Sequence, residues 1–145
     1  MHVDGKSHTG AVITLGKGVV YAKSSKQKVV SKSSTEAELI ALSDSSSQII
    51  WTRDFLIGQG YNLDAATIYQ DNQSTMALVK KGQSNSERSR HINIRYFFVK
   101  DRVEQGDVKI EYKATGDMLA DVLTKPLQGS LFVRLRDLLL NCCVV

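Results

Sequence analysis

The longest regular pattern in the chain is helical, and it covers Glu36 to Ile57. Apolar residues recur there with the period of an α-helix, at Leu39, Leu42, Ile49, Ile50, Phe55 and Leu56. The polar residues Ser33 to Thr35 supply candidate N-caps. Gly58 and Gly60 end the pattern. The chain therefore contains one long helix, and the segments on either side of it decide the fold class.

Shorter segments on both sides of this helix have β character. Gly10–Leu15 and Val19–Ala22 predict a β-hairpin that turns at Gly16 to Gly18. A further short strand is expected at Lys28–Ser31. Two strands follow the long helix, at Ala66–Gln70 and at Val108–Lys113, where apolar and polar residues alternate strictly.

The remaining periodic segments are helical. They are a short helix that Ser74 caps and that ends at Lys81, a helix over Ile92–Val103, a short helix from Thr115 to Lys125 before Pro126, and an amphipathic helix over Leu131–Leu140. No repeat and no interdomain linker interrupts this order. We therefore predict a single mixed α/β domain over residues 1–145.

Composition excludes several classes of protein. With 145 residues, 42% of them hydrophobic and 23% charged, the chain is neither collagen-like, nor of low complexity, nor broadly disordered. No apolar run approaches the roughly 20 residues that span a bilayer, and the first residues have no apolar signal region. Cys142 and Cys143 are adjacent, a spacing that suits neither a zinc site nor an internal disulfide. We expect a soluble intracellular protein with two incidental thiols.

Positive charge is concentrated in two places. The formal net charge is +4, and the segment between Gly5 and Thr35 holds six lysines and no acid. A second cluster follows a polar loop and consists of Arg88, Arg90, His91 and Arg95. Such clusters are typical of nucleic-acid binding, although a solvated basic face fits equally well. The candidate phosphate-binding residues are Lys23, Lys26, Lys28, Arg88, Arg90, His91 and Arg95.

Three carboxylates occupy positions that suggest a site. Glu38 lies four residues before Leu42 and on the same side of the long helix, so its carboxylate leans toward the face that packs on the sheet. It also fits a capping box with Thr35, in which it would bond to the backbone at the helix start. Asp71 follows a strand directly, where ligands bind in α/β sheets, but an Asp-Asn pair is also a common turn. Asp121 is flanked by apolar residues, which places it at an edge of the core or against a ligand.

Taken together, the three carboxylates predict a metal centre. Carboxylates that converge repel one another unless a cation lies between them. Ligand sets made only of oxygen favour Mg²⁺ or Mn²⁺, and a pair of such ions activates water for phosphodiester hydrolysis. An acidic centre with a basic rim indicates a nuclease.

Four segments of the sequence resemble one known family, the ribonuclease H domain at the C-terminal end of copia-type (Ty/copia) retrotransposon Pol polyproteins. They are Lys32–Leu42, Tyr69–Ser74, Arg90–Phe97 and Leu119–Leu127. The resemblance covers about Asp4 to Leu139. It implies a ribonuclease H-like fold, a mixed β-sheet flanked by helices.

The resemblance also implies an activity and its participants. Glu38, Asp71 and Asp121 match the family's metal ligands and catalytic acids for Mg²⁺ or Mn²⁺. The substrate is the RNA strand of an RNA/DNA hybrid made during reverse transcription, and the partner is the reverse transcriptase domain of the same polyprotein. Neither a membrane nor a small-molecule cofactor is expected. The location would be the cytoplasm, in a virus-like particle, or the nucleus.

One family feature has no counterpart in the chain. The family has a fourth acid, an aspartate on the first and central strand, and that strand precedes the hairpin. In this sequence the strand and its aspartate are not found, and Asp4 matches a loop position. An inactive relic that binds nucleic acid or a protein partner is therefore the alternative to an active nuclease. An unrelated α/β interaction module is a third alternative.

Overall fold

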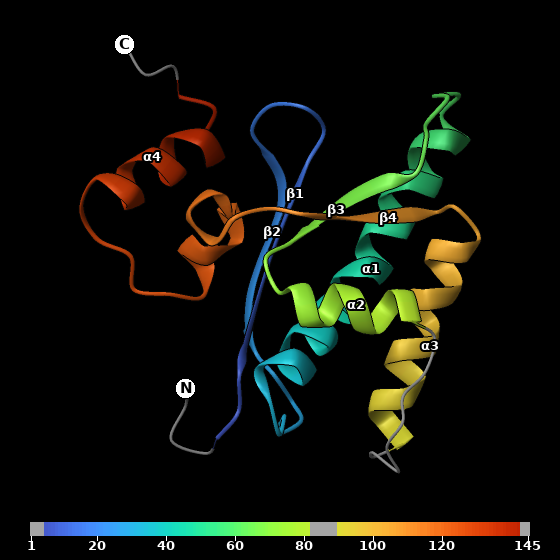
Figure 1. Ribbon diagram of the computed structural model, residues 1–145. Helices are drawn as coiled ribbons and strands as arrows, with labels where there is room; N and C mark the ends of the chain where they lie inside the picture. Colours follow the sequence, from blue (N-terminus) through green and yellow to red (C-terminus); the bar gives the residue numbers. More distant parts are fainter. Residues whose placement is uncertain (1–4, 82–89, 143–145) are drawn as a thin grey trace. The chain divides into compact units, whose positions relative to one another are not determined.

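A computed structural model describes residues 5–81 and 90–142 (Figure 1). The elements are β1 (His8–Thr14), β2 (Val19–Lys26), α1 (Ser34–Gly58), β3 (Ala66–Gln70), α2 (Gln73–Lys81), α3 (Arg90–Glu104), β4 (Val108–Tyr112), the 3₁₀ turns η1 (Thr115–Asp117) and η2 (Leu119–Leu123), and α4 (Gly129–Leu139). The predicted mixed α/β class is confirmed. No helix in the described ranges is long and apolar enough to cross a membrane.

The chain divides into two compact units. Unit 1 comprises Met1–Ser31 and Lys113–Val145, and unit 2 comprises Lys32–Tyr112. Each is described below by itself. The prediction of one domain stays a prediction.

Unit 2 is a parallel strand pair with three helices. β3 and β4 pair in parallel from Ala66↔Val108 to Gln70↔Tyr112. Parallel strands need a long crossover connection, which α2 and α3 supply. Helices α1, α2 and α3 pack on one another and against the two strands (Figure 1). The carboxyl ends of both strands therefore lie at the same edge of this small sheet.

The core of unit 2 uses only the first part of the apolar pattern on the long helix, since Phe55 near its end is 52% exposed. Leu39, Ile40 and Leu42 on α1 are buried, as are Ile68 on β3 and Val108 on β4. The same unit buries Val79, Ile92, Tyr96 and Val99 from α2 and α3. The long helix predicted over Glu36–Ile57 is confirmed as α1.

Unit 1 contains the predicted hairpin. β1 and β2 pair antiparallel from His8↔Lys26 to Thr14↔Val19. η2 packs closely on β1, because a Cβ atom added to Gly10 would lie 2.5 Å from Cγ2 of Thr124 and 2.9 Å from the Ala120 carbonyl oxygen. The Ser24 hydroxyl also donates to the Leu123 carbonyl oxygen at 2.7 Å. Only a glycine leaves room for η2 at this point of the strand.

Two predicted elements near the ends of unit 1 are wrong. Lys28–Ser31 is not a strand, because within the described residues no strand lies beside it to pair with. The single helix predicted from Thr115 to Lys125 is two separate 3₁₀ turns. Met118 lies between them with φ −76° and ψ 104°, an extended backbone that interrupts any helix.

The sheet also differs from the expectation of one mixed β-sheet. The described strands form two separate pairs, β1–β2 antiparallel and β3–β4 parallel. In the part of the chain that the structure describes, no strand joins them. A sheet needs a strand with partners on both sides to continue, and each of these four strands has one partner.

Candidate functional site

The N-terminal end of α1, where Glu38 lies, is capped by Ser33 together with Glu36. The Ser33 hydroxyl accepts a hydrogen bond from the Glu36 N–H at 3.2 Å, and Glu36 in turn accepts from the Lys32 N–H at 2.7 Å. Ser33, and not Thr35, is therefore the N-cap of α1, which excludes the alternative of a capping box between Thr35 and Glu38. The signal lay in the preceding serine, which stands three residues before a glutamate.

Asp71 likewise does not cap the helix that follows it. The Asn72 side chain accepts from the Thr75 N–H at 3.1 Å, so Asn72 and not the predicted Ser74 caps α2. Thr75 is fully buried, and its hydroxyl donates to the Thr35 carbonyl oxygen at 3.4 Å. This bond ties the start of α2 to the start of α1.

Gln70, which the sequence analysis did not single out, links Glu38 to the segment of Asp71. Its Nε2 donates to Oε2 of Glu38 at 3.4 Å. Its Oε1 accepts from the N–H groups of Asp71 at 2.9 Å and Asn72 at 3.1 Å. The structure thus brings the Glu38 side chain to the end of β3, which Asp71 follows directly. A polar glutamine that ends an apolar strand was the available signal.

Asp121, the third predicted ligand, belongs to unit 1. It lies in η2, its side chain is 13% exposed, and Nζ of Lys125 pairs with its Oδ2 at 2.7 Å. Its backbone carbonyl oxygen accepts from the N–H groups of Thr124 and Lys125. The spacing of four residues between acid and lysine was the signal for this ion pair. That Asp121 meets Glu38 and Asp71 stays a prediction.

The predicted phosphate-binding residues are spread over both units. Lys23 and Lys26 lie exposed on β2, and Lys28 is exposed just after it. Arg90 and His91 are exposed at the start of α3. Arg95 makes an ion pair with Asp44 of α1, which gives it a role within unit 2. Arg88 lies outside the described residues.

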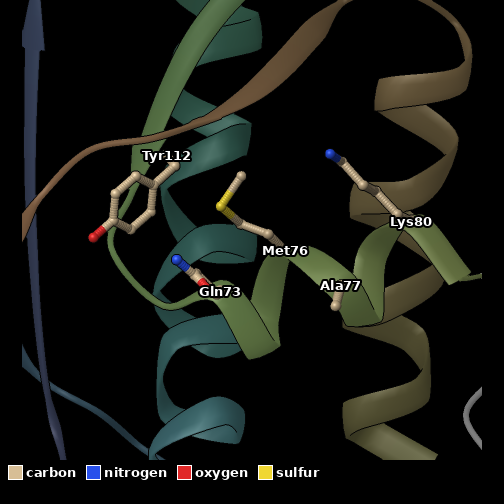
Figure 2. A pocket seen from close by; sticks show the side chains of 5 residues that line it. All are labelled: Gln73, Met76, Ala77, Lys80 and Tyr112. Atoms are coloured by element: carbon tan, nitrogen blue, oxygen red, sulfur yellow. The ribbon is translucent and has the colours of Figure 1, made fainter.

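A pocket of about 370 Å³ opens in unit 2 beside the segment of Asp71. It is lined by Gln73, Met76, Ala77 and Lys80 of α2 and by Tyr112 at the end of β4. Figure 2 shows the Met76 thioether between the Tyr112 ring and the Lys80 side chain. None of the five lining residues is acidic, so the pocket is an apolar hollow with one cation at its side.

The side-chain chemistry of the predicted metal ligands suits a hard divalent cation. Glu38 and Asp71 offer carboxylate oxygens, which Mg²⁺ and Mn²⁺ prefer. In neither unit do three or more described His, Cys, Asp or Glu side chains gather closely enough to hold a metal ion. Within unit 2, the structure therefore links the Glu38 side chain to the Asp71 backbone through Gln70, without a cluster of three such side chains.

Comparison with known proteins identifies relatives of one kind. The chain is 32% identical over 133 residues to a retrovirus-related Pol polyprotein from transposon TNT 1-94 of Nicotiana tabacum, and 36% identical over 127 residues to the one from transposon RE1 of Arabidopsis thaliana. It is 29% identical over 126 residues to the transposon Ty1-JR1 Gag-Pol polyprotein of Saccharomyces cerevisiae. Its homologues are retrotransposon Pol polyproteins.

The alignments cover most of the chain but little of each Pol polyprotein. They include 92%, 87% and 84% of the chain for the tobacco, Arabidopsis and yeast relatives. The chain spans about a tenth or less of the length of these curated relatives, 10%, 9% and 7% respectively. No family model matches the chain. No solved structure matches it.

Proposed function

We propose that the chain is the ribonuclease H domain of a retrotransposon Pol polyprotein and hydrolyses the RNA strand of RNA/DNA hybrids during reverse transcription. One observation carries the proposal. Gln70 links the Glu38 side chain to the backbone of Asp71 and Asn72, and this supports a site that includes both acids at the end of β3. The homology to Pol polyproteins agrees with this assignment.

The carboxylates would hold Mg²⁺ or Mn²⁺. Two such ions would supply an activated water and charge stabilisation for the leaving oxygen in phosphodiester hydrolysis. The ligands that we propose are Glu38, Asp71 and Asp121. The fourth acid of the family would come from a strand paired with the described ones.

Two features of the described residues support a nucleic-acid substrate. Lys23 and Lys28 are exposed on and after β2, in a segment without acids, which favours contact with phosphates. The pocket along α2 combines the Tyr112 ring with the Lys80 ammonium group, which suits a sugar and a phosphate. The reverse transcriptase domain of the polyprotein would supply the hybrid, in the cytoplasm or nucleus.

The experiment measures cleavage of a labelled RNA/DNA hybrid in Mg²⁺. We would assay the chain alone and the chain extended at its N-terminus by the segment that precedes the homologous region in the tobacco Pol polyprotein. We expect the extended protein to cleave the RNA strand, and Asp71→Asn to reduce its rate by about 10³-fold or more. Cleavage that Asp71→Asn leaves intact would disprove the proposed roles.

The second candidate function is a nucleic-acid-binding relic. The observation in its favour is that Lys23 and Lys28 are exposed in a segment without acids, where they would contact phosphates whether or not the carboxylates hold a metal ion. Hybrid binding that weakens with salt, without cleavage by either protein, would select it. An extended protein that neither binds nor cleaves the hybrid would exclude both functions.

A further inference from the structure

Gln70 is a buried amide whose two ends are both engaged. The residue closes β3, and its side chain is 5% exposed. A buried amide is costly unless its polar atoms find partners. Oε1 accepts from two successive backbone N–H groups, and Nε2 donates to a carboxylate. Both polar ends of the Gln70 side chain therefore have partners, and these partners belong to two separate segments, α1 and the residues that follow β3.

The surroundings fix which end of the amide points where. The N–H groups of Asp71 and Asn72 can only donate, so they require the oxygen. The Glu38 carboxylate requires the NH₂ group. A flipped amide would set donors against donors and oxygen against oxygen, so only the observed orientation is stable.

No other residue type can make these three bonds at this length. A glutamate supplies the acceptor and not the donor, and a lysine supplies the donor and not the acceptor. An asparagine has both groups but is one methylene shorter. The identity of the residue is therefore dictated by Glu38 on one side and the turn at Asp71 on the other.

We infer that Gln70 is a positioning residue that sets the Glu38 carboxylate and the Asp71–Asn72 backbone in a fixed relation. The inference rests on the proposed function, in which Glu38 and Asp71 hold one divalent cation. Groups behind the ligands orient them, and their loss typically weakens metal binding by about 10–100-fold. Gln70 would do this for two ligands together, because it bonds to α1 and to the end of β3.

The first test needs no metal and no activity. In the full chain, Gln70→Met replaces the amide by an unbranched apolar side chain of similar length, which suits a buried position. We expect hydrogen exchange of the Asp71 and Asn72 amides to rise about tenfold, and Gln59→Met, at an exposed glutamine, to leave both unchanged. In Glu38→Gln, the NMR signals of the Gln70 side-chain amide should shift.

The second test uses Mn²⁺ binding, measured by water-proton relaxation. We expect Gln70→Met to weaken binding about tenfold, and to add less than about twofold when Glu38 is already glutamine. Unchanged amide exchange in a folded Gln70→Met variant would overturn the inference. If Gln70→Met fails to fold, Gln70 side-chain signals that Glu38→Gln does not move would overturn it. If both NMR signatures appear and the N-terminally extended protein without substitutions binds no Mn²⁺, the bridge is supported and the proposed function fails.

Discussion

The two units bury apolar surface in different ways. Unit 2 contains most of the fully buried apolar residues among those described, whereas unit 1 contributes Ala11 and Leu135. Unit 2 packs three helices and a strand pair together, while unit 1 has a two-stranded hairpin, short 3₁₀ turns and one helix. An isolated hairpin is marginally stable. Helices with apolar faces therefore build the core, and the hairpin unit depends on a few close contacts.

The largest expected effect comes from a matched pair of buried leucines. Leu39 on α1 and Leu135 on α4 are both fully buried. We expect Leu39→Ala to lower the free energy of unfolding by about 4 kcal/mol and Leu135→Ala by about 2.5 kcal/mol, because a denser core relaxes less around a cavity. Urea denaturation measures both values. Equal losses would show that the two units are packed equally well.

Gly10 tests the close contact that organises unit 1. Gly10→Ala should destabilise the protein by about 2 kcal/mol, because its Cβ would force η2 away from β1. The control is Gly116→Ala, whose Cβ would meet no atom within 4 Å. Thermal unfolding compares the two variants. A neutral Gly10→Ala would mean that η2 moves aside freely.

The cap of α1 tests the alternative that the sequence left open. Ser33→Ala removes the acceptor of the Glu36 N–H and should cost about 1 kcal/mol of stability. Ser34→Ala, at the first residue of the same helix, should change the unfolding midpoint little. If Thr35→Ala were the more damaging variant, the assignment of the cap would be wrong.

The smallest effect concerns Arg95. Its ion pair with Asp44 is partly exposed, so Asp44→Asn and Arg95→Ala should each lower stability by only about 0.5 kcal/mol, and less at high salt. Lys23→Ala, at an exposed position of β2, should leave stability unchanged. Denaturation at two salt concentrations measures these differences. A loss above about 2 kcal/mol would show a buried network around Arg95.

The sequence predicted some helices and strands more closely than others, for a physical reason. α1, β3, α3 and the hairpin were predicted closely, because each has a periodic pattern and local start or stop signals. The two 3₁₀ turns were not, because Met118 breaks a segment whose composition suits a helix. The end of β3 before Asp71 was predictable from the strand pattern, but the hydrogen bonds of Gln70 to Glu38, Asp71 and Asn72 were not.

The sequence by itself determined the α/β class, the long helix, and the types and order of the acidic residues. These features are local, since they depend on residue type, spacing and neighbours along the chain. Only tertiary structure decided that Ser33 and Asn72 cap their helices and that Gly10 admits η2. It also joined Gln70 to Glu38, 32 positions away. Hydrogen bonds and close packing between distant segments depend on where the folded chain places each atom.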